Sequence, residues 1–346
     1  MIITRFHDLE KIELKLEFLT PAFLGGADGN AELRSAPFKN LLRQWWRISN
    51  GHLHTKELGK KEGELFGVAG AKETDSHRSL VTLYITGIDY KDFFEHSYNP
   101  KHNQHSIPRY NSSMTQIIKP FIYLGYGPVP TNGPWKRFIK PGKRINVNIY
   151  FPHKIKAEIE KILYLAHHFG AVGSRSRNGW GAFSLESDDI DFDKLFSIKT
   201  NNLENAFCEK RYPWTLGKDE KGLLCWETAN RFDNWESAMV EMAKIYATLR
   251  YNTKEMKNIN ARAILGYPLR NATISEKTDR IPKQLRMTFN KINGKLAGIF
   301  YHLPFKLPVD LISNIQEIEL WKAIHRYLDS SAQLRRCSSI IQGVQS

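Results

Sequence analysis

Hydrophobic and polar residues alternate in four short stretches in the first half of the chain. The stretches are residues 12–18, 79–87, 144–151 and 181–187. Because successive side chains of a strand point to opposite faces, this period of two predicts strands with one buried face. Pro21 follows the first strand and Gly87 closes the second.

Two longer segments repeat their hydrophobic residues at helical spacing. Residues 35–51 begin with Ser35 as a suitable N-cap, carry Pro37 in the first turn and stop at Gly51. The second segment, residues 154–170, places these apolar side chains on one face: Ile155, Ile159, Ile162, Leu163 and Ala166. Both segments are predicted helices.

The predicted elements follow the order strand, helix, strand, strand, helix, strand. This is the split βαβ order of ferredoxin-like folds, and it predicts an N-terminal domain over residues 1–200. Residues 97–142 are polar and rich in proline, so we expect an insertion with short strands there, one of them at residues 120–127.

The second half of the chain predicts another α+β domain, over residues 201–346. Residues 188–222 are acidic and irregular, as in a linker. Helices are expected at 235–252 and 310–330, and a hairpin at 284–304 with Asn293-Gly294 as a type I′ turn. The last residues resemble a mobile tail. The predicted fold class is therefore α+β: two ferredoxin-like (RRM-like) domains with a glycine-rich loop and insertions.

Composition narrows the class of protein. With 41% hydrophobic residues, the 346-residue chain can bury a core, and no apolar run approaches the roughly 18 residues of a membrane span. The first residues alternate and carry charge, unlike a signal peptide. The three cysteines lack CxxC spacing, which indicates a reducing compartment and disfavours a disulfide framework or structural zinc. We therefore expect a cytoplasmic protein.

The net charge of +14 is distributed unevenly. Residues 96–157 contain ten Lys or Arg and no Asp or Glu, and residues 33–56 are also free of acids. Segregated positive charge is typical of proteins that bind a polyanion, and nucleic acid is the favoured partner. The alternative is a solvated basic face without a partner.

The first predicted helix separates its apolar and basic residues. Its cations Lys39, Arg43 and Arg47 gather opposite the hydrophobic arc. Cations at one-turn spacing repel each other unless an anion neutralises them, and a phosphate backbone would do so. Trp46 lies at the border of the two faces, where it offers its ring to a base or covers the edge of the core.

The segment GAVGSRSRNGWG, residues 170–181, is hereafter called the glycine loop. Glycines allow positive φ and close approach of a ligand, Arg175 and Arg177 supply charge, and Trp180 stands between two glycines where its face is expected to be exposed. The loop lacks the GxxxxGK[ST] and GxGxxG patterns of nucleotide sites. A plain surface turn would explain the glycines but not the arginines.

Two segments resemble motifs of the RAMP-superfamily CRISPR proteins, specifically the first subunit of the Cmr (type III-B) effector complex. The first fits the pattern of a strand, T-P-x-F-x-G-G, an arginine and a basic helix, although Asn40 stands where glycine is usual. The second is the G-x-G-S-R-x-R-x-G-x-G loop, and LGYP at 265–268 resembles a shorter motif. The matching residues are Thr20, Pro21, Phe23, Gly25, Gly26, Arg34, Lys39, Leu42, Arg43, Trp45, Trp46, Arg47, Gly173, Ser174, Arg175, Arg177, Gly179 and Gly181.

The resemblance implies two ferredoxin-like domains and a non-catalytic role in clamping RNA at one end of a guide-directed antiviral complex. The implied partners are the CRISPR guide RNA, target RNA and other Cmr subunits, with no membrane, cofactor, metal or catalytic residue. The candidate RNA-binding residues are Arg34, Lys39, Arg43, Trp46, Arg47, Gly173, Ser174, Arg175, Arg177 and Trp180. We expect the helix and the loop to converge into one continuous cationic track.

The main alternative is a metal-independent endoribonuclease that processes CRISPR RNA. It would need a general base, usually His, near a phosphate. The paired histidines are His52/His54, His102/His105 and His167/His168. The last pair ends a predicted helix, where the dipole favours a cation; Asp28 is the one acid near the first basic patch. A protein that lies on anionic lipid is a weaker alternative, because the apolar helix faces are needed for cores.

Overall fold

A computed structural model describes the protein at residues 8–25, 31–68, 76–95, 98, 104–108, 115–193, 198–208, 215–252, 259–266, 282–306 and 317–337. Several features of the sequence interpretation, at Gly26, Asp28, His102, residues 267–268 and the start of the last predicted helix, lie outside these residues.

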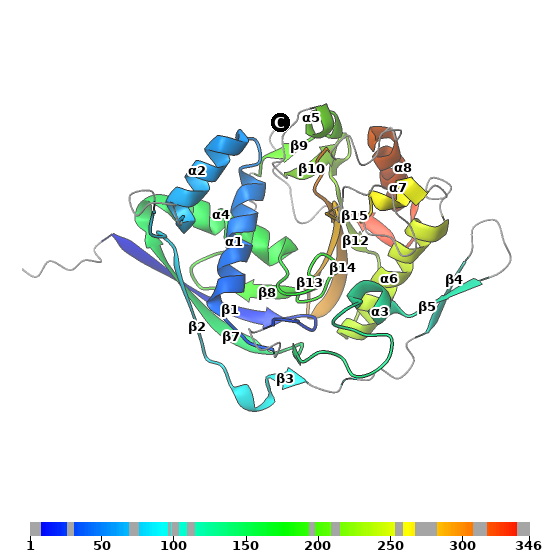
Figure 1. The fold of residues 1–346 in the computed structure, drawn as a ribbon, viewed down its shortest axis with the longest axis horizontal. Helices are drawn as coiled ribbons and strands as arrows, with labels where there is room; N and C mark the ends of the chain where they lie inside the picture. Colours follow the sequence, from blue (N-terminus) through cyan, green and yellow to red (C-terminus); the bar gives the residue numbers. More distant parts are fainter. Residues whose placement is uncertain are drawn as a thin grey trace, which may run out of the picture.

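The first half contains an antiparallel four-stranded sheet in the order β2-β7-β1-β8. Its strands are β1 (Leu9–Phe18), β2 (Thr82–Thr86), β7 (Arg144–Pro152) and β8 (Phe183–Glu186). Every second residue of β1 from Ile12 to Phe18 is buried, as the alternation predicts. Helices α1 (Ser35–Ser49) and α4 (Lys156–Phe169) pack against each other and cover this buried face (Figure 1). The predicted order of elements is confirmed.

The second half repeats this plan. Its sheet has the order β13-β14-β12-β15, built from β12 (Cys225–Thr228), β13 (Leu285–Ile292), β14 (Lys295–His302) and β15 (Leu334–Arg336). Helix α6 (Trp235–Asn252) follows β12, and α8 (Glu317–Ser330) precedes β15. Both halves therefore run βαββαβ with the same spatial order of strands, which we call the first and second units.

The predicted hairpin is present in the second unit. β13 and β14 pair from Leu285↔His302 to Ile292↔Lys295, and Asn293 and Gly294 between them have φ of +50° and +79°. The prediction of a mobile tail was wrong at its start, because Leu334–Arg336 forms β15 beside β12.

Short elements connect and decorate the two units. In the first half they are α2 (Thr55–Phe66), η2 (Tyr90–Asp92), β3 (Phe94–Glu95), β4 (His105–Pro108), β5 (Thr115–Ile118), α3 (Pro120–Gly125), β6 (Phe138–Ile139) and η3 (His153–Ile155). In the second they are β9 (Thr200–Asn201), α5 (Leu203–Cys208), β10 (Leu216–Asp219), β11 (Gly222–Leu223) and α7 (Ile259–Ala263).

These connections correct three local predictions. Residues 120–125, expected as a strand, form α3, because Pro120 occupies a first helical position, where its fixed φ suits a helix. The expected linker at 188–222 contains α5 and the small β11-β10-β9 sheet. Ser35 is the first residue of α1, and the N-cap is Arg34, whose side chain makes no capping hydrogen bond.

Aromatic side chains join the two units. The ring of Trp45 on α1 lies 5.8 Å from Phe169 at the end of α4 and 6.2 Å from Tyr301 on β14, between ring centroids. Because Trp45 is 2% exposed, the core of the first unit continues into the sheet of the second. The segment between α4 and β8 therefore runs close to this junction.

Candidate nucleic-acid interface

The glycine loop is attached to the segment that follows β1. The amide of Ser174 donates to the Phe23 carbonyl at 2.9 Å, and the Thr20 hydroxyl donates to the Gly179 carbonyl at 2.7 Å. The backbone of Gly173 has φ of +90°, and a Cβ there would lie 2.6 Å from the Phe23 oxygen. Two segments more than a hundred residues apart in the sequence are thus bound together. Their backbones approach so closely at residue 173 that only glycine fits there.

The other side of the loop is attached to the second unit. The Met287 amide donates to the Arg177 carbonyl at 3.1 Å, next to a parallel bridge between Asn178 and Met287. The ammonium of Lys283 donates to Asn178 Oδ1 at 2.8 Å, and Asn178 Nδ2 donates to the Leu124 carbonyl at 2.8 Å. The loop is therefore wedged between the two βαββαβ units.

The charged residues of the loop reach the surface. Ser174, Arg175 and Arg177 are exposed, and Arg175 takes the left-handed conformation with φ of +61°. Protein atoms nevertheless crowd around the guanidinium of Arg177, and this desolvation lowers its pKa. Both arginine side chains lie at the surface, and their contact with RNA remains a prediction.

Trp180 contradicts the prediction of an exposed ring. It is 0% exposed and packs against Phe23 and Trp135, with ring centroids 5.2 and 5.5 Å away. The reason is that the Trp180 side chain packs into the core of the second unit, where it also meets Trp235 of α6 at 6.1 Å. In this conformation no base can stack on Trp180, so its role is to hold the junction.

The cations of α1 are neutralised partly from within the protein. Glu62 on α2 accepts from Arg43 Nε at 2.7 Å, and from Arg47 Nε at 2.5 Å and Nη2 at 2.7 Å. The sequence interpretation expected a phosphate to neutralise these arginines. In the structure the anion is the Glu62 carboxylate, whose side chain is 6% exposed. Arg43 and Arg47 still expose 34% and 52% of their side chains. With Lys39, they leave this face positive.

Two further candidates, Trp46 on α1 and Arg34 at its N-cap, have local partners. Trp46 is 2% exposed and donates from Nε1 to Glu158 at 2.7 Å, so the prediction that it stacks on a base is not supported by its position. Burial, followed by the charge of Arg43, lowers the pKa of Lys39. Arg34 donates to the Gly25 carbonyl at 3.2 Å and pairs with Glu32 at 3.3 Å.

The convergence of helix and loop into one track remains a prediction. Among the described residues, Arg43 and Arg47 attach to α2 through Glu62, whereas the loop attaches to β13 and α3. The buried face of α1, through Trp45, approaches the end of α4 from which the loop starts.

A second group of cations beside the loop was missed by sequence reasoning. Lys283 and Arg286 are each 8% exposed, and Lys283 Nζ lies 3.8 Å from the ring centroid of Tyr246. Burial is the main cause that lowers the pKa of Lys283 far below its usual range; the positive charges of Arg250, Arg177 and Arg286 add to it. Burial also lowers the pKa of Arg286 to about 10. We call Arg177, Arg250, Lys283 and Arg286 the basic junction.

The histidines named for the nuclease alternative have structural contacts. His167 Nδ1 lies 2.9 Å from the Leu185 carbonyl and His168 Nε2 lies 3.2 Å from the Phe192 carbonyl. Burial lowers the pKa of His168 to about 3, so the helix dipole does not make this pair cationic. His54 accepts from the Lys56 amide at 3.4 Å as the N-cap of α2. His52 Nε2 lies 3.1 Å from Lys199 Nζ, and its pKa is lowered first by burial.

Within the described part of the chain, no three His, Cys, Asp or Glu side chains are grouped as metal ligands would be. Nor does that part contain a helix with the length and hydrophobicity needed to span a bilayer.

Two βαββαβ units with a basic glycine loop wedged between them define the class of this protein. Residues 15–184, which include β1, α1 and the glycine loop, match the RAMP superfamily. Residues 15–184 belong to the RAMP superfamily, and the resemblance seen in the sequence motifs is confirmed at the level of the superfamily.

Solved structures align with this chain at low sequence identity. Cmr1 from Pyrococcus furiosus, in its apo form, aligns with a TM-score of 0.51 and 17% identity over 94% of this chain and 98% of its own. A chain in the type III-B Cmr-beta complex bound to cognate target RNA aligns with a TM-score of 0.47 and 14% identity, over 92% and 100%. The first of these establishes a mixed α+β fold similar to that of Cmr1. No curated protein sequence matches this chain.

Proposed function

We propose that this protein is a non-catalytic RNA-binding subunit of a type III-B (Cmr) CRISPR effector complex, with two ferredoxin-like (RRM-like) domains formed by the two units. It would act in antiviral defence in the cytoplasm, with guide or target RNA and other Cmr subunits as partners. The superfamily match and the fold similarity to Cmr1 support the placement in this kind of complex.

The observation that carries the proposal is the position of the glycine loop. The loop presents Arg175 and Arg177 to solvent. Asn178 of the same loop accepts a hydrogen bond from Lys283 of the basic junction. Surface guanidinium groups beside the buried ammonium group of Lys283, at the junction of the two units, suit the phosphates of an RNA strand. The buried Trp180 and Trp46 leave phosphate contacts, rather than base stacking on these rings, as the source of affinity.

The lowered pKa values of Lys283 and Arg286 in the basic junction fit the same role. Burial and mutual repulsion disfavour the charged forms of Lys283 and Arg286 in the free protein. A phosphate placed beside them would stabilise those charged forms and relieve the repulsion. RNA binding is therefore expected to strengthen as pH falls from alkaline values toward neutrality.

Replacing Arg175 and Arg177 with Ala tests the proposed contacts. If both side chains touch phosphates of a single strand, the slope of log affinity against log salt should fall by about 1.4, at about 0.7 per phosphate. Fluorescence anisotropy with labelled RNA at several salt concentrations measures it. The control is Lys295→Ala, which removes an exposed lysine paired with Asp233 at 3.2 Å. An unchanged slope in the double variant would contradict the proposal.

The endoribonuclease alternative is tested by the same RNA. Incubation of the purified protein with labelled RNA, with and without magnesium, should leave the RNA intact if the subunit only binds. If specific cut products appear only when this protein is present, its function is cleavage rather than binding alone.

A further inference from the structure

Two cysteines that are far apart in the sequence lie together in the second unit. The register Trp226↔Arg336 of β12 and β15 places Cys225 opposite Cys337 at the next position, and the Cys337 amide donates to the Cys225 carbonyl at 3.1 Å. The Cys225 thiol donates to Cys337 Sγ at 2.9 Å. The sequence interpretation treated the cysteines as scattered, because pairing across strands leaves no local spacing pattern.

The geometry of this pair is that of a cross-strand disulfide site. Residues directly opposite each other at a hydrogen-bonded position of antiparallel strands have Cα atoms about 5.5 Å apart. Cysteines are bridged most often at about 5.5–6 Å. The two thiols therefore need no large backbone movement to form a bond.

Access to the pair depends on the short strand β15. Cys225 is 0% and Cys337 is 7% exposed, and burial raises the pKa of the Cys337 thiol. Thiolates, not thiols, react with oxidants, so the closed structure protects the pair. However, β15 has only three residues and lies at the edge of its sheet, where local opening needs little free energy.

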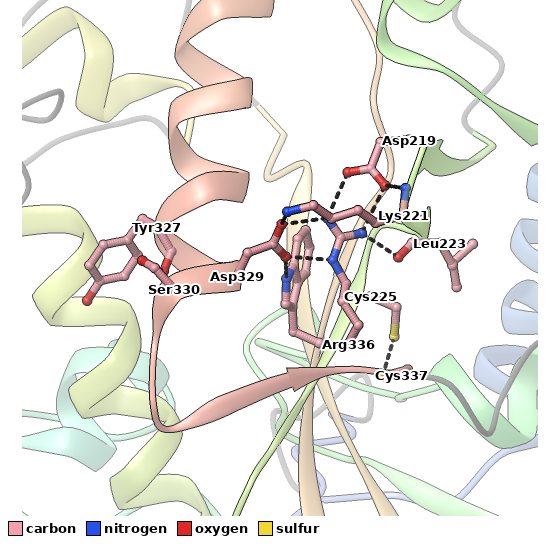
Figure 2. Close-up of polar contacts among 10 residues, drawn as sticks. Asp219, Lys221, Leu223, Cys225, Tyr327, Asp329, Ser330, Arg336 and Cys337 are labelled. Carbon is pink, nitrogen blue, oxygen red and sulfur yellow. Dashed lines mark hydrogen bonds and ion pairs between the residues drawn. The ribbon is translucent and has the colours of Figure 1, made fainter.

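Arg336, next to Cys337, holds β15 in place (Figure 2). Its Nε donates to Asp329 at 2.6 Å, its Nη2 to Asp219 at 2.7 Å and its Nη1 to the Leu223 carbonyl at 2.8 Å. Lys221 pairs with the same Asp329 at 2.9 Å but does not belong to the strand. The Arg336 contacts thus oppose the separation of β15 from β12, which would expose Cys337.

We propose that Cys225 and Cys337 form an oxidisable dithiol site, which a peroxide converts to a disulfide when β15 opens, and that Arg336 limits the rate. One thiolate attacks a peroxide oxygen and becomes a sulfenic acid as hydroxide leaves and takes a proton. The second thiolate then attacks that sulfur, and the hydroxyl leaves as water. Hydrogen peroxide is reduced to two waters, and two thiols are oxidised to one disulfide.

The consequence is a covalent link between the first and last strands of the second unit. It would close a loop of 112 residues. Such a link stabilises a protein mainly by restricting its unfolded chain. A reducing compartment keeps the pair as thiols, so the second unit, which carries most of the basic junction, would gain stability only under oxidative conditions. This inference is independent of the proposed RNA binding.

The test uses the full chain, reduced and then treated with hydrogen peroxide. The remaining thiols are alkylated and counted by intact mass, and the cross-linked peptides are mapped. Reduced protein has three alkylatable cysteines. We expect one after oxidation, a Cys225–Cys337 peptide, and a melting temperature raised by about 5–10 °C that reductant reverses. Cys208→Ser should keep the link, and Cys337→Ser should abolish it.

A second pair of variants tests the role of Arg336 by rate. Arg336→Ala should accelerate disulfide formation several-fold, whereas Lys221→Ala should change it little. Equal rates in both variants would remove Arg336 from the proposal. A disulfide that includes Cys208, or three alkylatable thiols after prolonged oxidation of the wild-type chain, would overturn the dithiol site. The last two readings use the wild-type protein, so they do not depend on the folding of a variant.

Discussion

Glu62 illustrates how a single buried residue changes the interpretation of a charged surface. Its carboxylate meets two arginines of α1 while exposing only 6% of its side chain. A pattern of cations along one helix cannot reveal the acid that a neighbouring helix supplies. The positive face of α1 is therefore weaker than its sequence suggests, but it is held in a fixed geometry.

Replacing Glu62 with Gln should destabilise the protein, because it leaves Arg43 and Arg47 facing each other without an anion. We expect a loss of about 1–3 kcal/mol in the free energy of unfolding, less than for a fully buried pair since both arginines reach solvent. Denaturant unfolding measures it. The control on the same helix is Glu57→Gln, whose solvent-exposed pair with Lys61 should contribute much less to stability. Equal effects of the two variants would show that Glu62 has no special role.

Buried histidines make the second unit sensitive to acid. His302 Nδ1 lies 3.0 Å from His325 Nε2, and burial lowers the pKa of His325 to about 3 and that of His302 well below its usual value. The unfolded chain binds protons near pH 6.5 and the folded protein does not. Stability is therefore complete above about pH 6.5 and is lost as the pH falls toward about 3.

We expect the urea midpoint to fall between pH 7.5 and pH 5, with each histidine contributing up to about 1.4 kcal/mol per pH unit. His325→Gln should flatten this dependence, even if it lowers stability at neutral pH. His77→Gln, at an exposed position, should leave the slope unchanged. A wild-type midpoint that does not vary with pH would refute the assignment.

At the scale of elements, the sequence predicted the helices and strands that have a regular hydrophobic pattern or a turn signal. It did not predict those that are buried throughout or stabilised by neighbouring elements. β1, β7, α1, α4 and the β13–β14 hairpin keep one buried and one exposed face, or carry a turn signal, so their sequences specify them. β12 is buried at all four residues and shows no alternation. β15 and α2 take their stability from neighbours, which no local pattern records.

The docking of the glycine loop is an element-scale property that Gly179 tests. Its φ is +86°, and a Cβ there would lie 2.6 Å from Phe289 of β13. Gly179→Ala should cost about 1 kcal/mol for the conformation and a further 1–3 kcal/mol for the clash. Gly133→Ala is the matched control, with φ of +90° and open space around it. Thermal unfolding should separate the two variants, and similar melting temperatures would show that the loop does not need this contact.

At the scale of the whole molecule, the candidate site joins parts that the sequence keeps apart. The arginines of the loop were predictable from their motif, whereas Lys283 meets Asn178 across 105 residues and Arg286 lies in a buried strand. A cation in such a strand itself indicates a functional or structural contact, since burying a charge without partners is costly. Trp46 and Trp180 show the opposite error: their motifs suggested contact with RNA, but both rings lie in the core.

The central claim is that the glycine loop and the basic junction grip one RNA strand between the two units. Photo-crosslinking of thiouridine-substituted RNA to the full chain, followed by peptide mapping, tests it most directly. The account predicts crosslinks to residues 173–178, which include Arg177 of the basic junction, and these crosslinks should be lost at high salt. Crosslinks confined to other surfaces, such as the exposed sheet face around Tyr84 and Tyr150, would contradict it.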